Sequence, residues 1–248
     1  MSIYVYGYTL ASAPHQLEDI SGVDEGDLFM VTYNDVSAIV SGYCHDKLLV
    51  KGKDIFTHQN VIRNLMDESS IIPLHFGLTL RDISSVEKVL MSNHDELRDQ
   101  LYRIYSKVEM EVSMRFAVDD LFDFMVGKYP QLREEKDKVA NGKLVFYLGD
   151  RARKGERFEN LLKKEKEIYA SQVEEVIGPW CAEIKRSKAI SLEREIVTFN
   201  CLVNRERLKV FERSIYEAGE RFSADFNFTF NGPWAPQHFC NLGTIEYA

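Results

Sequence analysis

Histidines are the first residues to weigh for chemistry, because imidazole is a frequent general base and metal ligand near neutral pH. His58 lies three residues after Ile55 and four before Ile62, a spacing that puts it on the apolar face of a helix. We therefore expect a core histidine with satisfied hydrogen bonds, in preference to a catalytic one. His75 interrupts a short apolar segment, where strand alternation favours an exposed or interface position.

Potential metal ligands occur only in pairs along the sequence. His238 alternates with Cys240, and Cys44 directly precedes His45. Zinc normally needs three or four protein ligands, so neither pair predicts a zinc site. The four cysteines lie far apart with no C-x-x-C pair, which favours reduced and mostly buried thiols over a disulfide framework.

Motifs of nucleophilic catalysis and nucleotide binding are missing from the sequence. It contains no G-x-S-x-G, no G-x-G-x-x-G and no G-x-x-x-x-G-K-[ST]. Glu109 and Glu111 share one face of an expected strand beside Ser113, where surface solubility explains them better than acid–base catalysis. We therefore expect no catalytic residue, no cofactor, no bound metal and no enzyme activity.

Composition is that of a globular protein, with 45% hydrophobic and 28% charged residues and a net charge of −8. Acidic residues outnumber basic ones before residue 118, which argues against nucleic-acid binding. A basic cluster at 151–166 is interleaved with glutamates and fits a solvated helix face. No apolar run is long enough to span a bilayer and the start does not resemble a secretory signal, so we expect a cytoplasmic protein that binds no lipid membrane.

Apolar periodicity divides the first half of the chain into strands and helices. The polar pair Asn34-Asp35 predicts a hairpin between two of the strands. Segment 71–78 is too short for a buried helix and contains Pro73, so we expect an edge or interrupted strand there. The other expected elements are strands at 3–10, 28–33, 36–43 and 108–118, a helix at 53–66, and a helix at 84–106 that breaks near Ser92-Asn93.

Helix formers dominate the chain from 119 to about 186. An apolar stripe from Tyr169 to Ile184 predicts that this long helix covers a sheet. A strand at 197–203 and a helix at 205–222 follow. Phe226, Phe228 and Phe230 then alternate with polar residues and predict a final strand with one aromatic face. Most aromatic side chains are expected in the core, and some as interface anchors.

Strands interspersed with helices in two blocks of similar size predict an α+β protein with two domains, each a sheet covered by helices. A ferredoxin-like or modified ferredoxin-like arrangement suits both blocks approximately. We place the N-terminal domain at 1–107. The C-terminal domain, with the long helical segment and the final strand and tail, is placed at 108–248.

Two separate segments resemble the gas vesicle F/L family. The first is His58-x-x-Val61 followed by I-P-L-H-F-G at 72–77, similar to the family's H-x-x-V and V-L-P-x-R-F-G. The second is F-N-G-P-W-A-P-Q-H-F at 230–239, similar to T-G-P-W-P-P-Y-N-F. They occur in the family's order, so the resemblance covers essentially the whole chain. His75 stands where the family has Arg, Ala235 where it has Pro, and Gln237-His238 where it has Tyr-Asn.

The resemblance implies a cytoplasmic accessory protein of the gas vesicle, without enzyme activity. Such a protein is a minor, chaperone-like vesicle component that binds the small hydrophobic protein of the shell and assists nucleation and assembly. One alternative is a scaffold that binds other accessory proteins without direct shell contact. An alternative of another class is a small-molecule sensor or enzyme, because ferredoxin-like folds host many unrelated functions.

The two resembling segments supply the candidate site residues, whose expected role is structural first and contact second. If Trp234 is buried, replacing it with Ala should destabilise its block by roughly 3–5 kcal/mol. The candidates are His58, Pro73, His75, Phe76, Gly77, Gly232, Pro233, Trp234, Pro236 and Phe239.

Overall fold

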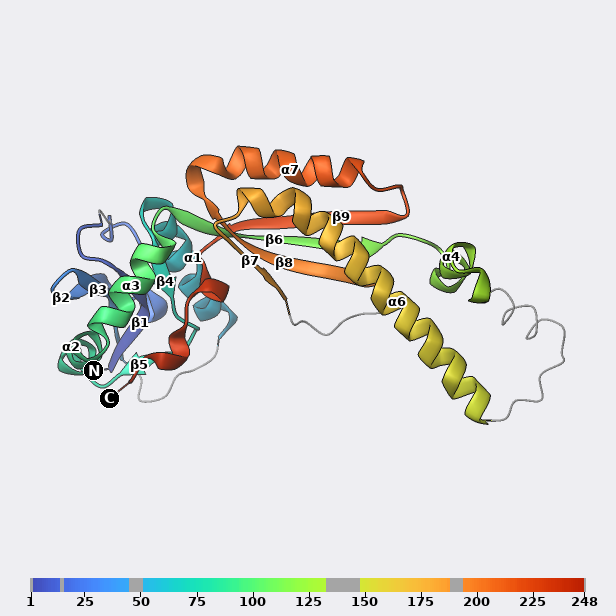
Figure 1. Ribbon diagram of the computed structural model, residues 1–248. Helices are drawn as coiled ribbons and strands as arrows, with labels where there is room; N and C mark the ends of the chain where they lie inside the picture. The colour runs from blue at the N-terminus through green and yellow to red at the C-terminus, as the bar shows by residue number, and fades with distance from the viewer. Residues whose placement is uncertain (1, 14–15, 45–50, 133–147, 188–193, 248) are drawn as a thin grey trace. The chain divides into compact units, whose positions relative to one another are not determined.

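The computed structural model describes residues 2–13, 16–44, 51–132, 148–187 and 194–247, and for 148–155 and 244 the backbone alone. The chain is α+β and contains two antiparallel sheets (Figure 1). It divides into two compact units, of which the first comprises Met1–Met110, Leu202–Glu206 and Gly232–Ala248 and the second Glu111–Cys201 and Arg207–Asn231. The domain boundary expected at 107/108 is a claim about which segments fold independently, and it stays a prediction.

The first sheet is built around a strand that is buried on both faces. Strand β1 (Ser2–Leu10) lies between β3 and β4 in the order β2-β3-β1-β4, and β5 also pairs with β1. The hairpin of β2 and β3 turns at Asn34, as its sequence predicts, with φ at 52°. The other strands are β2 (Leu28–Tyr33), β3 (Val36–Tyr43), β4 (Ile71–Pro73) and β5 (Thr79–Leu80).

The segment expected as an edge or interrupted strand is both. Strand β4 pairs antiparallel with Gly7–Thr9 of β1, and β5 pairs with Ile3 and Tyr4 farther along the same strand. Between them, Leu74 N–H donates to Tyr6 O (2.9 Å) and Val5 N–H donates to Leu78 O (3.0 Å). The chain therefore leaves the ladder only near His75 and returns to it at once.

Three helices of the first unit pack on its sheet. The predicted break of the second helical region is confirmed, because α2 (Ile83–Ser92) ends and α3 (His94–Ile104) begins around Asn93. Apolar residues of α2 and α3 share one buried cluster with Ile3 and Val5. Helix α1 (Gly52–Glu68) contributes buried His58, Val61 and Leu65. A short 3-10 helix, η1 (Val23–Glu25), follows β1.

The second sheet has the strand order β7-β8-β6-β9. The alternating run expected at 108–118 forms β6, and each of its apolar side chains is buried. The strand predicted from the three phenylalanines forms β9 and continues to Trp234. The bounds are β6 (Lys107–Phe116), β7 (Glu183–Arg186), β8 (Glu195–Asn204) and β9 (Phe226–Trp234).

Long helices of the second unit cover the aromatic face of this sheet. Tyr169 of α6 (Leu148–Ile177) contacts the ring of Phe226 at 4.8 Å between centroids. Phe222, just after α7 (Leu208–Glu220), contacts the same ring at 5.4 Å. The remaining short elements of the chain are α4 (Leu121–Lys128), η2 (Gly178–Trp180), η3 (Arg205–Arg207), η4 (Gln237–Phe239) and η5 (Leu242–Thr244).

The expected helical region ending near 186 is wrong at its C-terminal end. Helix α6 stops at Ile177, because Gly178 and Pro179 follow and proline cannot donate the next helical hydrogen bond. The chain then forms strand β7.

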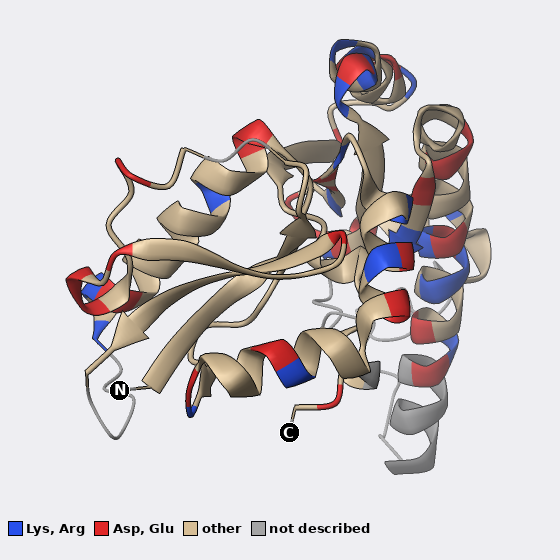
Figure 2. Ribbon diagram, turned by 90° about the vertical axis from the view of Figure 1, so that its left-hand side faces the viewer, with Lys and Arg blue, Asp and Glu red and all other residues tan. Residues whose placement is uncertain are grey.

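Charged residues of both signs alternate along the described part of α6 (Figure 2). Glu156, Arg157, Lys163 and Lys164 are exposed, as expected for a solvated helix face, whereas Glu165 is buried and accepts hydrogen bonds from Lys128 and Tyr129. Within the described residues, no helix has the length and apolar character needed to cross a membrane.

Candidate interaction site

His58 lies in the core of the first unit, and both of its ring nitrogens are hydrogen-bonded. Nε2 lies 3.0 Å from Leu74 O, which only accepts, so Nε2 carries the proton and donates. Nδ1 then accepts from the Tyr4 hydroxyl at 3.0 Å, and that hydroxyl accepts from Gly77 N–H at 2.9 Å. Burial lowers the pKa of His58 and raises the pKa of Tyr4, so both are neutral at pH 7. No lone pair of His58 remains for general-base chemistry.

Residues 73–77 are positioned by this network. Pro73 is buried in β4, and the Phe76 ring meets His58 edge-on at 5.8 Å. Gly77 has φ at 107°, a conformation that side-chain-bearing residues rarely adopt. His75 alone points to solvent, as its alternation predicts. The first resembling segment therefore holds α1 against β1, and His75 is its most exposed residue.

Gly232 lets the second resembling segment pass close to β6. Its φ is 125°, and a Cβ there would lie 2.8 Å from both Glu109 O and Met110 Sδ. The peptide bond to Pro233 is cis. Pro236 and Phe239 are buried, whereas Pro233 is exposed and Trp234 is 44% exposed. Trp234 therefore does not meet the condition of burial on which the expected loss of 3–5 kcal/mol depended.

Glu109 receives the tail of the chain and is not a surface residue, which corrects the solubility role expected for it. Its side chain is almost completely buried. The carboxylate accepts the backbone N–H of His238 at 3.0 Å and also a hydrogen bond from His238 Nδ1. The face that Glu109 shares with Glu111 is polar by alternation, but at Glu109 the tail covers it. His238 is thus engaged in holding the tail.

Side chains of the α3 region bind the backbone of the tail at further points. Gln100 donates from Nε2 to Asn241 O (3.0 Å) and accepts Asn241 N–H (2.7 Å). Asn93 makes the same pair of bonds with Glu246, at 3.1 and 3.0 Å. Each amide side chain therefore bonds the tail backbone as a neighbouring β-strand would, because it offers one donor and one acceptor to the same residue. Arg103 also donates to Phe239 O.

The cysteines of the two pairs considered for metal binding differ in burial. Among the described residues, no three His, Cys, Asp or Glu side chains lie close enough to hold a metal ion. Cys44 is exposed, and its neighbour His45 lies outside the described residues. Cys240 is partly buried beside the core cluster of the first unit.

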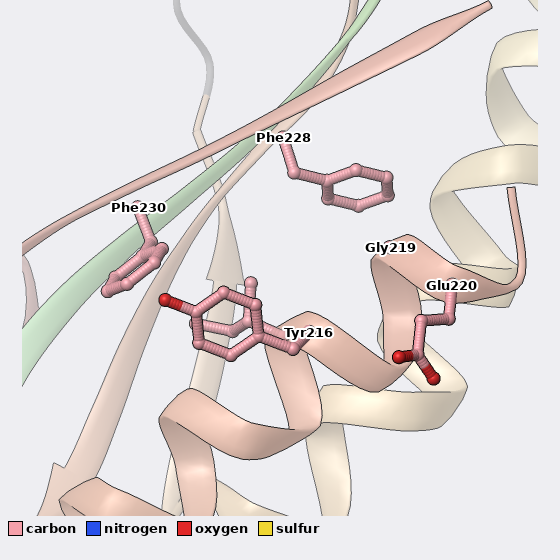
Figure 3. A pocket seen from close by; sticks show the side chains of 6 residues that line it. Tyr216, Gly219, Glu220, Phe228 and Phe230 are labelled. Carbon is pink, nitrogen blue, oxygen red and sulfur yellow. The ribbon is translucent and has the colours of Figure 1, made fainter. Parts of the chain in front are cut away.

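An apolar groove lies between α7 and β9 in the second unit. The rings of Phe228 and Phe230 project from β9 toward α7, and the Tyr216 ring lies toward Phe230 (Figure 3). The Tyr216 and Phe230 centroids are 6.1 Å apart, and Tyr216 is 63% exposed. Ile215, Gly219 and Glu220 complete the lining of a groove of about 350 Å³. This is an aromatic surface open to solvent.

Gly219 makes the floor of the groove on the helix side. A Cβ at this position would meet only Phe228 Cδ2, at 4.0 Å, so there is room for a side chain. Glycine in a helix is less stable than alanine by about 1 kcal/mol, which makes its presence beside open space unusual. The sequence identified the phenylalanine row but not this groove. The available signal was Tyr216 and Gly219, each one residue beyond the apolar face that Ile215 and Ala218 define.

Comparison with known proteins connects the chain with gas vesicles. A family profile described as "Gas vesicle synthesis protein GvpL/GvpF" matches residues 2–241. Gas vesicle protein F of Dolichospermum flosaquae is 22% identical over 246 residues, covering 97% of this chain and 98% of that protein. Gas vesicle protein F of Streptomyces sp. (strain CB03234) is 23% identical over 248 residues, covering 96% and 99%.

Two solved structures share the fold of this chain. The crystal structure of the gas vesicle protein GvpF from Anabaena sp. PCC7120 superposes with a TM-score of 0.86 at 18% identity, covering 97% of this chain and 98% of that chain. The crystal structure of GvpF from Microcystis aeruginosa gives a TM-score of 0.81 at 18% identity, covering 97% and 99%. At these identities the likeness establishes a shared fold.

Proposed function

The chain belongs to the GvpL/GvpF family of gas vesicle synthesis proteins, and from this premise we propose that it binds the small hydrophobic shell protein and assists vesicle nucleation and assembly. In this proposal it acts in the cytoplasm as a chaperone-like protein and stays with the vesicle as a minor component. Its partner has apolar surface that must be kept from aggregating until the wall forms. The required activity is binding, without a chemical reaction.

The observation that carries the proposal is the solvent-exposed aromatic groove between α7 and β9. Tyr and Phe side chains supply large contact area at little conformational cost, which suits an apolar partner. His58 of the first resembling segment and His238 of the second are hydrogen-bonded within the first unit, whereas His75 points to solvent. Those hydrogen bonds support a structural role, whereas Tyr216, Phe228 and Phe230, the last of which begins the second resembling segment, offer surface to a partner.

Co-expression tests the proposal directly. A tagged form of the full chain should retain the shell protein through washing at ordinary salt, because apolar contacts are not screened by ions. Cells that lack the chain should form fewer vesicles. Failure to retain the shell protein would refute the proposed binding, and normal vesicle formation after deletion would refute the proposed role in assembly. Retention of other accessory proteins alone, in pairwise assays with isolated components, would favour the scaffold alternative.

We also propose that the second sheet is of the ferredoxin-like type. Its elements follow the order β6, helix, β7, β8, α7, β9, which is the β-α-β-β-α-β pattern. The first sheet has the same spatial order, with β2-β3-β1-β4 corresponding to β7-β8-β6-β9. It has no helix of comparable length among the described residues between β1 and β2, which supports a modified form there.

A further inference from the structure

We infer that β9 and the groove beside it form a strand-addition site. The site takes an extended segment with apolar side chains at alternate positions and a basic side chain near Glu220. The inference rests on the proposed function for the source of that segment, which is the shell protein. The binding mode rests on the edge position of β9, the spacing of its phenylalanines and the charge of the groove.

Backbone groups of β9 are available at a free edge. Within the described residues, β9 ends the strand order of its sheet and has β6 on one side only. Ala117 N–H, just after β6, donates to Asp225 O at 2.6 Å. Because backbone groups alternate in direction along an antiparallel strand, those of Asn227 and Thr229 face β6 and those of Phe228 and Phe230 face the free edge. An added strand would bond to the second set.

The two edges of this sheet differ in protection. Edge strands usually carry charged side chains, or are very short, because a bare edge invites pairing with another chain. Strand β7, at one edge, has four residues, and three of them are charged. Strand β9, at the other edge, has nine residues and no charged side chain. The sheet therefore blocks one edge and leaves the other open.

Side-chain spacing in the groove matches an added strand. Phe228 and Phe230 are two residues apart, which is the repeat of side chains on one face of a strand. An incoming strand would place every second side chain beside these rings and under α7, where Gly219 leaves space. A helix would present its side chains at another spacing. The occupant is therefore an extended segment.

The charge of the groove indicates which kind of side chain the bound segment carries. Among the described lining residues, Glu220 is the only charged one. It is the last residue of α7, where the helix dipole already makes the environment negative. A carboxylate at that position is better stabilised when a cation lies beside it. Charge complementarity therefore calls for a Lys or Arg in the bound segment.

Matched variants of the full chain test the site in co-expression with the shell protein. Gly219→Leu fills the groove, and we expect about tenfold weaker binding or more, which corresponds to losing a central contact. Gly219→Ala adds only a methyl group and should bind like the wild type. Thr229→Lys places a charge on the edge strand and should weaken binding similarly, whereas Thr229→Gln should not. Both positions tolerate the change in folding, because Thr229 is exposed and Gly219 faces open space.

Amide hydrogen exchange on the complex gives a readout specific to strand addition. Phe228 and Phe230 amides should become protected on binding, whereas the amides of Asn227 and Thr229 should change little, because they already face β6. Uniform protection, or binding unchanged by both Gly219→Leu and Thr229→Lys, overturns this inference and leaves the proposed function standing. Absence of any complex overturns both. A wild-type dimer that Thr229→Lys dissociates, with shell binding unchanged, assigns the edge to a second copy and also overturns it.

Discussion

Replacing His58 tests whether a neutral histidine, hydrogen-bonded at both ring nitrogens, stabilises the first unit. His58→Ala leaves the Tyr4 hydroxyl without its acceptor and Leu74 O without its donor. Each buried polar group left unpaired costs about 1–3 kcal/mol, so we expect a loss of about 3–4 kcal/mol in the free energy of unfolding. His58→Gln keeps one donor and one acceptor at the site and should lose less than half as much. Urea unfolding monitored by circular dichroism measures both values.

The pH dependence of stability should differ between the wild type and His58→Gln, because glutamine does not titrate. Burial lowers the pKa of His58 in the folded state, so below about pH 6.5 the unfolded chain binds a proton that the folded chain resists. Stability of the wild type therefore falls as pH decreases from about 6.5, with a slope of up to about 1.4 kcal/mol per pH unit from this group. His58→Gln lacks this contribution, while all other titrating groups are shared. Parallel curves for the two proteins between pH 7 and 5 would refute the assigned protonation state.

Three further substitutions test the second resembling segment and the tail that follows it, each by urea unfolding. Gly232→Ala should destabilise by at least about 1–3 kcal/mol, because φ is 125° and the Cβ would clash with Glu109 O; a change near zero would contradict this geometry. Gln100→Leu should cost about 2 kcal/mol and speed hydrogen exchange at Asn241, and unchanged exchange there would show that the amide pair does not hold the tail. Trp234→Ala should cost under about 2 kcal/mol, because the side chain is 44% exposed, and a loss of 3–5 kcal/mol would show that it is buried.

Local periodicity was enough to predict most strands and helices. The alternation through β6 and the break at Asn93 are set by neighbouring residues, so a sequence reveals them. Strand β7 was missed because it has four residues, mostly charged, directly after a long helix. Its strand conformation comes from pairing with β8, which local sequence does not encode.

Contacts between residues far apart in the sequence account for the other features that periodicity did not predict. Alternation predicts a surface position for Glu109, and its burial follows from contact with the tail, including its bond to His238, 129 residues away. The pairing of Gln100 with Asn241 spans 141 residues and leaves no periodic trace. The groove depends on the approach of α7 to β9, so Gly219 and Tyr216 gain meaning only in three dimensions. Motif resemblance supplied the family, whereas geometry supplied the candidate surface.

Photo-crosslinking from the groove tests whether the shell protein binds there. A photoreactive phenylalanine analogue at Tyr216, which is 63% exposed beside the groove, should crosslink to the co-expressed shell protein. The matched control is the same analogue at Tyr102 on α3, which is 57% exposed and lies in the other unit. We expect a shell-protein adduct from position 216 and none from position 102. Equal adducts from both positions, or none from position 216, would contradict this expectation.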